Sequence, residues 1–135
     1  MPNLNDTRGI LVNYFKTAWG STTKIAYQNV PFDDTGLTEY VETKLIPLHD
    51  SNACIGSYDT KRKRHEGVLA IFIYTKQNSS AFRAYELADL VADYMDNKKI
   101  ASNLTTSASI NYDEGVRKDG WYSVNVRIPF TSDEQ

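Results

Sequence analysis

Residue types that could carry nucleophilic chemistry occur at two places in this sequence. The first is the run His49-Asp50-Ser51, which has the three residue types of a hydrolase triad. Consecutive side chains of an extended segment point to opposite faces, so these three cannot form a Ser–His–Asp relay within one segment. The second is the single cysteine, Cys54, whose small and apolar neighbours are typical of a buried, inert thiol. No residue is therefore predicted to be catalytic.

Metal and cofactor sites also lack the residues they need. One cysteine cannot form an internal disulfide, and no CxxC or HxxxH spacing offers zinc ligands, which fits a reducing cytoplasm. The seven glycines are scattered singly, so there is no glycine-rich phosphate-binding loop. The acidic pairs Asp33-Asp34 and Asp113-Glu114 lie in predicted turns, where carboxylates more often solvate the turn than catalyse. We expect no metal, no cofactor and no enzymatic activity.

The one pronounced charge cluster is the basic run Lys61, Arg62, Lys63 and Arg64, which we predict to lie at the tip of a hairpin. It holds four of the 15 Lys and Arg residues, so the rest of the chain carries 11 positive against 17 negative charges, or −6. The run is either a solvated turn or a partner-binding site for an acidic protein surface or for nucleic acid phosphates. It contains no aromatic residue that could stack on a base, which disfavours single-stranded or sequence-specific recognition.

Length and composition predict a single domain spanning residues 1–135. The chain is 41% hydrophobic, which is enough for one core, and its formal charge of −2 excludes a wholly cationic surface for nucleic acid. The mean hydropathy is −0.49. The longest apolar run, Val68 to Tyr74, is far shorter than the roughly 20 residues that span a bilayer, so we expect no membrane partner. The first six residues lack a secretory signal, so we expect the chain to stay where it is made.

Two segments have the periodicity of amphipathic helices. Residues 4 to 19 place apolar side chains on one stripe, and Gly20 follows as a C-terminal stop. Residues 80 to 97 form the second predicted helix, with a cap at Ser79 or Ser80 and cations following its end. The apolar stripes are Leu11, Tyr14, Phe15 and Ala18 in the first helix and Ala84, Leu87, Ala88, Val91 and Met95 in the second.

The remaining segments alternate with period two, as strands with one buried face do. We expect strands at about residues 22–28, 38–48, 53–60, 66–76, 104–112 and 122–130. Pro47 suggests the end of its strand or an edge position. The strand containing Val68 to Tyr74 is apolar on both faces and is predicted to be central. The chain is therefore predicted to be an α+β protein, a two-layer α/β sandwich whose mostly antiparallel mixed sheet has both helices on one face.

The sheet face without helices should carry small polar side chains. Water can cover such a face, or further copies of the protein can. Small side chains let another surface approach closely, so this face is a candidate oligomer surface. Its candidate residues are Ser107, Ser109, Ser123, Asn125 and Arg127. The aromatic residues have two interpretations, an exposed patch or parts of the core, and these are Trp19, Tyr27, Phe32 and Trp121.

From Ile10 to Phe130 the sequence resembles the tail terminator proteins of long-tailed bacteriophages, including the lambdoid minor tail protein U kind. The resemblance is carried by the first helix ending in Ala18-Trp19, by the segment from Ile25 to Phe32, and by the closing segment from Trp121 to Phe130. Further matching pieces are Gly56, Arg64 and Gly67 around the hairpin and Leu87-Ala88-Asp89 in the second helix. The sequence departs from the family at residues 76–80, where relatives often have Gly-x-Gly, and at Tyr40, where many have Trp.

The resemblance implies a structural virion protein at the head-proximal end of the tail, assembled in the host cytoplasm. It would form a ring, a hexamer in the assembled tail, that binds the tail tube protein and ends tube polymerisation. The opposite face of the ring would bind the head–tail connector protein, and DNA would pass non-specifically through the ring. The alternatives are another head-to-tail connector or completion component, a tail tube component, and a small cytoplasmic ligand-binding or nucleic-acid-binding α+β domain.

Overall fold

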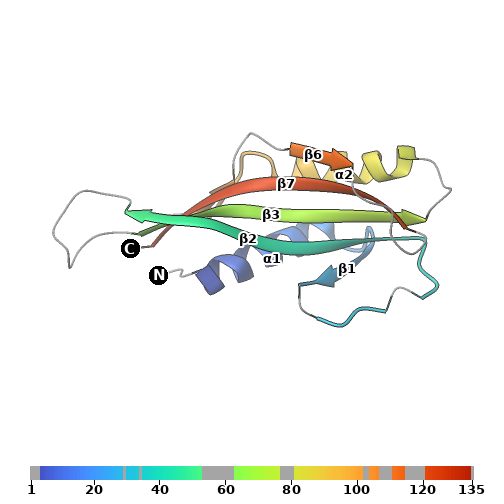
Figure 1. The fold of residues 1–135 in the computed structure, drawn as a ribbon, viewed down its shortest axis with the longest axis horizontal. Helices are drawn as coiled ribbons and strands as arrows, with labels where there is room; N and C mark the ends of the chain where they lie inside the picture. The colour runs from blue at the N-terminus through green and yellow to red at the C-terminus, as the bar shows by residue number, and fades with distance from the viewer. Residues whose placement is uncertain are drawn as a thin grey trace.

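The described part of the chain forms one seven-stranded sheet and two helices (Figure 1). This computed structural model describes residues 4–28, 30–33, 35–52, 63–76, 81–101, 104–106, 111–114 and 121–134. The elements are α1 (Leu4–Trp19), β1 (Lys24–Tyr27), β2 (Glu39–Asn52), β3 (Lys63–Lys76), α2 (Ala81–Met95), β4 (Lys99–Ala101), β5 (Leu104–Thr106), β6 (Asn111–Glu114) and β7 (Trp121–Glu134). The strand order is β1-β2-β3-β7-β5-β4, and β6 also pairs with β7. Among these pairs only β1 and β2 run parallel.

Both helices cover the same face of the sheet, which confirms the predicted two-layer α+β class. Along β3, Leu69, Ile71 and Ile73 are fully buried beneath the helices. The alternate residues, such as Phe72 and Tyr74, lie on the opposite face, which we call the helix-free face. Because β3 is paired with β2 on one side and β7 on the other, the prediction that it is central is also confirmed. The core joins Leu11, Phe15 and Trp19 of α1, Ala84, Leu87, Val91 and Met95 of α2, and Val41, Val124, Val126 and Ile128 of the sheet.

Helix α1 has the bounds that its apolar stripe predicts. Leu11, Phe15 and Trp19 recur every four residues and are almost completely buried, and the Phe15 and Trp19 rings stack with centroids 5.3 Å apart. The helix ends at Gly20, which has a positive φ of 60° and donates its N–H to Lys16 O at 3.0 Å. A residue with a Cβ would be strained in that conformation, so glycine is the residue that allows this stop.

Helix α2 is shorter than predicted. It ends at Met95 rather than Asn97, and Asn97 itself adopts a positive φ of 50°. A contact from a distant strand accounts for the stop: the Thr106 hydroxyl donates to Met95 O at 2.6 Å and accepts the Lys98 N–H at 2.8 Å. The chain turns there into β4, a three-residue strand that the sequence analysis did not predict. The predicted caps Ser79 and Ser80 lie outside the described residues.

The long hairpin of the sheet is built from different segments than predicted. Its first strand is β2, which reaches Asn52 and pairs with β3 from Glu39 onward. The predicted strand 53–60 lies outside the described residues. Pro47 does not end β2, because the register shifts between Pro47 and His49 and the strand continues. Strand β1 pairs with β2 only at Tyr40 to Thr43, so Pro47 lies on an edge segment where a missing N–H is tolerated.

The predicted strand 104–112 is two separate strands in the structure. Strand β5 pairs with one part of β7 and β6 with another, while residues 107–110 lie outside the described ranges. Strand β7 is 14 residues long and reaches Glu134, further than the predicted end at residue 130. Its length lets two short strands pair in sequence along one edge.

Candidate functional site

The helix-free face is the main surface that the fold leaves without a helical layer. Three rows of cross-strand neighbours run over it from β2 to β7: Tyr40, Tyr74 and Ser123; Glu42, Phe72 and Asn125; Lys44, Ala70 and Arg127. The aromatic residues and Arg127 of these rows are of the types enriched where proteins bind each other, whereas Glu, Lys, Ser and Ala are depleted there.

The candidate oligomer residues on β7 lie on this face but differ in accessibility. Ser123 and Asn125 are only 4% and 7% exposed, whereas Arg127 is exposed. The Oδ1 atom of Asn125 is buried without a hydrogen-bond partner among the described atoms. Ser107 and Ser109 lie outside the described residues, so their place on the face stays a prediction. In the structure of a single chain, Arg127 is therefore the accessible member of the described set.

Four aromatic side chains gather at one end of the helix-free face, and we call them the aromatic cluster: Phe32, Tyr40, Tyr74 and Trp121. The ring of Tyr40 is central, with centroid distances of 4.9 Å to Phe32, 4.8 Å to Tyr74 and 5.0 Å to Trp121. Lys76 Nζ lies 4.4 Å from the centroid of the Trp121 ring, within range of a cation–π interaction. Phe32, at the rim, is 36% exposed.

The sequence points to only part of this cluster. Phe32 and Trp121 have two interpretations in the sequence, an exposed patch or parts of the core, whereas Trp19, which shares them, belongs to the core. The cluster forms because the register sets Tyr40 opposite Tyr74 and Lys76 opposite Trp121. Registers of strands this far apart in sequence cannot be read from alternation alone, although the period-two placement of the aromatics on one face was a usable signal.

A charged side chain adjoins the aromatic cluster but does not equip it for acid–base chemistry. The Tyr74 hydroxyl donates to Glu42 Oε1 at 3.3 Å. Burial of the phenol, followed by the charge of Glu42 and the proximity of Tyr40, raises the pKa of Tyr74 above its usual value. The phenol therefore stays protonated at neutral pH. A hollow of about 330 Å³ beside it is lined by Gln28, Glu42, Thr43, Lys44, Phe72 and Tyr74.

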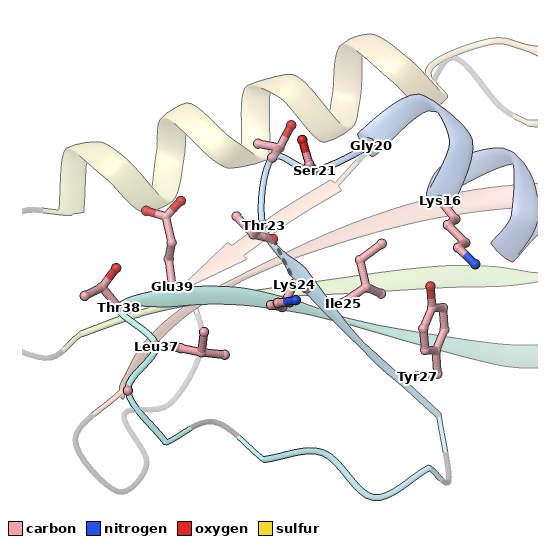
Figure 2. Close-up of a pocket in the computed structure, with 12 residues that line it drawn as sticks. Lys16, Gly20, Ser21, Thr23, Lys24, Ile25, Tyr27, Leu37, Thr38 and Glu39 are labelled. Carbon is pink, nitrogen blue, oxygen red and sulfur yellow. Dashed lines mark hydrogen bonds between the residues drawn. The ribbon is translucent and has the colours of Figure 1, made fainter.

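A second cleft, of about 570 Å³, lies between the end of α1, strand β1 and the start of β2 (Figure 2). Two of its hydroxyl groups are used in the fold. Thr23 accepts the Trp19 indole N–H at 3.0 Å and donates to Lys24 O at 2.9 Å, and the Thr22 hydroxyl donates to Trp19 O at 2.8 Å. These bonds hold the turn that leads from α1 into β1.

One carboxylate of this cleft is also occupied. Arg83 of α2 makes two bonds to Glu39, with Nε to Oε1 at 2.9 Å and Nη2 to Oε2 at 2.8 Å, and contacts Glu86 as well. The hydrogen bonds that Arg83 donates to Glu39 and Glu86 raise the pKa of Arg83. This paired contact joins α2 to the start of β2 and leaves Glu39 unsuited to act as a general base.

The described residues contain neither a metal-binding cluster nor a spanning helix. No group of three or more His, Cys, Asp or Glu side chains in the described ranges could hold a metal ion. None of the helices described is long and apolar enough to cross a membrane. The exposed Asp33 accepts the Thr35 N–H at 3.0 Å. Hydrogen bonding from the Thr35 side chain, and then from its N–H, lowers the pKa of Asp33, which fits a carboxylate that stabilises a turn.

The basic run does not lie wholly at the hairpin tip, contrary to the prediction. Lys63 and Arg64 belong to β3, while Lys61 and Arg62 lie outside the described residues. The register sets Arg64 between Ser51 and Asp133, and Lys63 between Asn52 and Glu134. They are incorporated in the sheet because β2 and β7 both extend further than expected. Arg64 is partly buried, and the following His65 is buried.

Comparison with known proteins places this architecture in a family. The family model for phage tail terminator proteins matches residues 8–130. Twenty-six chains of solved structures match, among them a protein designated only by a sequence identifier, which has 14% identity and a TM-score of 0.64 over 95% of each chain and thus shares the fold. A search of curated proteins gives no match. The resemblance inferred from the sequence is therefore confirmed, because a match over most of its length shows that the chain belongs to the phage tail terminator family.

Proposed function

We propose that this protein ends the growth of the phage tail tube by binding its tip as a ring of identical copies, six in the assembled tail. The observation that carries the proposal is the family match over residues 8–130. The family consists of structural tail proteins, so the chain has a structural role in the phage tail. The ring would bind the tail tube protein on one side and the head–tail connector protein on the other, at the head-proximal end of the tail. Assembly would take place in the host cytoplasm.

The helix-free face supports a role in assembly. It carries the aromatic cluster and the exposed Arg127, and no helix of the described chain covers it. Aromatic residues and arginine are the types enriched where proteins bind each other. Asn125 lies on the same face, but its Oδ1 is buried within the single chain, so Arg127 is the described member of the set that a neighbouring subunit can reach. With Ser107, Ser109 and Ser123, these residues form the proposed oligomer face.

The basic run is the second proposed contact. Lys61 to Arg64 would reach an acidic surface of the tail tube or of the neighbouring subunit, with DNA in the ring as the second choice. The rest of the chain is acidic at −6, so this localised positive charge can orient the protein against a partner. The cross-strand neighbours of Lys63 and Arg64 on β7 are Glu134 and Asp133, so Lys61 and Arg62 would supply most of the charge offered to a partner.

The direct test is electron microscopy of particles made by phage that lack this gene. Loss of a terminator should give abnormally long tails, and expression of the wild-type protein in trans should restore the normal length. Absence of tails would instead identify a tube subunit, and tails of normal length that fail to join heads would identify another connector component. Either of those results would overturn the proposal.

A further inference from the structure

We propose that neighbouring copies in the ring join through their sheet edges. Strand β1 of one copy would pair with β6 of the next, while β4 of that next copy would lie along the outer edge of β2. The inference rests on the proposed ring and specifies how its subunits bind each other. A second copy of this chain is the occupant of both edges.

The described part of the sheet has edge strands on both sides. Among the described residues, β1 pairs with β2 alone, β6 with β7 alone, and β4 with β5 alone. Figure 1 shows β1 and β6 at opposite edges of the sheet. Such edges offer backbone N–H and C=O groups that can pair with another strand, and on β1 the Tyr27 C=O already accepts the Val30 N–H at 3.1 Å.

Strands β1 and β6 also lie at the same level of the sheet. Following the register across the strands, Ile25 aligns with Val41, Ile73, Val124 and finally Glu114. In the same way Tyr27 aligns with Thr43, Ile71, Val126 and Tyr112. Both edge strands have four residues. A neighbour placed beside the sheet, without displacement along the strands, therefore brings β6 against β1.

The strand directions agree with this pairing. Strand β1 is parallel to β2, and the steps from β2 to β3, β7 and β6 are each antiparallel, so β6 runs opposite to β1. A neighbour in the same orientation presents its β6 antiparallel to β1, the geometry in which strands pair most readily. Because the two surfaces differ, the contact is heterologous, and repeated by rotation it can close a ring.

The two edges are also stepped in complementary ways. At the level of β1 the sheet has five strands, β1-β2-β3-β7-β6, and at the level of β4 it again has five, β2-β3-β7-β5-β4. Strand β1 thus projects one strand beyond β2 on one side, and β4 projects one strand beyond β5 on the other. When β1 of one copy lies beside β6 of its neighbour, β4 of that neighbour lies beside β2 of the first copy. Each projection fits the recess of its neighbour.

The β4 side of the contact has its own support. The register aligns Lys99 with Thr105, Thr131, Glu66 and His49, so β4 lies level with the end of β2. Leu48, next to His49 at the edge of β2, is 63% exposed, the largest exposed fraction among the large hydrophobic side chains described. A neighbouring strand along β2 would remove this side chain from water.

Charge favours a neighbour's β6 beside β1. Strand β1 begins with the exposed Lys24, whereas the sequence of β6 ends in Asp113 and Glu114. Lys24 aligns with Tyr40, and Asp113 aligns with Asn125, so the register assigns both positions to the helix-free face. The same register sets Asp113 opposite Ala26, so Lys24 and Asp113 would be diagonal neighbours on that face, where opposite charges are favourable.

The resulting ring would have a channel of plausible width. Five strands spaced by about 4.8 Å make each copy about 24 Å wide along the ring. Six copies then give a circumference of about 140 Å and a backbone diameter of about 45 Å. A closed sheet of this size leaves an open channel after side chains are added, in keeping with the proposed passage of DNA.

Cross-linking of exposed edge residues tests the contact. In a Cys54→Ser background, Leu48→Cys and Lys99→Cys are made as separate proteins and supplied together to phage that lack the gene. Capped tails are purified and treated with a bis-maleimide that spans about 8 Å, more than the roughly 5 Å between neighbouring strands. Heterodimers of the two proteins are expected from the mixture, and no dimers are expected from either protein alone. Tyr85→Cys, on the exposed surface of α2, replaces Leu48→Cys as the matched control and should give no dimer with Lys99→Cys.

The outcomes separate this inference from the proposed function. If the wild-type protein fails to restore normal tail length, the proposed function fails. If it restores tail length but the mixture gives no heterodimer, or if one variant alone forms dimers, the edge contact is wrong and the proposed function stands. Should Leu48→Cys or Lys99→Cys impair capping, Lys24→Glu and Asp113→Lys provide an independent measurement. Each single charge reversal should lower the yield of capped tails about tenfold or more, and the double variant should restore it. Lys99→Glu tests general loss of charge and should not be rescued by Asp113→Lys.

Discussion

The neighbours of Gly67 leave no room for a side chain at this position. A Cβ built there would lie 2.6 Å from Ile46 O and 2.9 Å from Cζ of Phe130. The carbonyl belongs to the backbone of β2 and cannot move without shifting the sheet. Gly67→Ala should therefore lower the free energy of unfolding by about 1–3 kcal/mol, the usual cost of overpacking. Chemical denaturation monitored by tryptophan fluorescence measures this change.

Gly9 is the matched control for that substitution. It lies within α1, and an added Cβ would meet no atom within 4 Å. Gly9→Ala should raise the free energy of unfolding by about 0.5–1 kcal/mol, because alanine loses less backbone entropy in a helix. Equal effects of the two substitutions would contradict the packing argument, which requires opposite signs.

Tyr74 should make stability fall at alkaline pH. Burial and the neighbouring Glu42 raise the pKa of its phenol in the folded state, so the unfolded chain releases this proton first, near about pH 10. The contribution of Tyr74 to stability is fully present below about pH 10 and is lost progressively as the pH rises from there through the higher pKa of the folded state. Relative to Tyr74→Phe, the wild-type protein should lose less than about 1 kcal/mol between about pH 9 and 11, since the phenol is partly exposed.

Denaturation of both proteins at several pH values checks this prediction. Glu42→Gln serves as the control: it removes the negative charge and should weaken the pH dependence without abolishing it, because burial is the larger cause. If the difference in the free energy of unfolding between wild type and Tyr74→Phe stays constant across this pH range, the folded protein does not raise the pKa of Tyr74.

At the scale of elements, Thr106 joins α2 to β5. Its hydroxyl donates to Met95 O at 2.6 Å and accepts the Lys98 N–H at 2.8 Å, and its own N–H donates to Lys98 O at 2.8 Å. Thr106→Val keeps the shape but leaves a carbonyl and an N–H without their partner. We expect a loss of about 1–3 kcal/mol in the free energy of unfolding.

The neighbouring Thr105 provides the control for this element contact. It is exposed, so Thr105→Val should change stability by no more than about 0.5 kcal/mol. Hydrogen exchange at the last turn of α2 should rise in Thr106→Val and stay unchanged in Thr105→Val. A uniform rise over the whole chain would mean that the bond contributes to global stability without specifically holding the end of α2.

The elements that the sequence predicts well are those defined by local patterns. Helix α1 has its expected bounds because its apolar stripe and Gly20 are both local, and β3 is central as its two-sided apolar run requires. The end of α2 depends on Thr106, eleven residues away from Met95, and no local signal announces it. Strand β4 is three residues long, too short to show an alternation. The aromatic cluster depends on registers between distant strands, which periodicity does not determine.

At the scale of the whole molecule, the described structure offers sheet edges and one face without a helical layer. In the larger cleft, the Thr23 hydroxyl holds the turn after α1 and Glu39 holds the contact with α2. The smaller hollow adjoins a phenol that remains protonated. The family match gives the chain a structural role in the phage tail.

The basic run divides into two pairs that should behave differently. Lys61→Gln with Arg62→Gln should leave the free energy of unfolding unchanged and impair tail completion, because it removes charge offered to a partner. Lys63→Gln with Arg64→Gln should also lower stability, by about 0.5–2 kcal/mol, because both positions lie in β3 with Asp133 and Glu134 as cross-strand neighbours. Denaturation midpoints and tail lengths measured in micrographs separate the two effects.

The role of Lys61 and Arg62 in binding a partner can also be measured through the dependence of binding on ionic strength. Binding of the wild-type protein to purified tubes should weaken as salt rises from about 0.05 M to 0.5 M, because charges at a surface are screened over a shorter distance. The Lys61→Gln and Arg62→Gln protein should bind more weakly at low salt and lose most of this dependence. If all four basic residues are replaced by Gln and tail length, head joining and salt dependence stay as in the wild type, the run is a solvated segment of the hairpin, and tube recognition must come from the helix-free face.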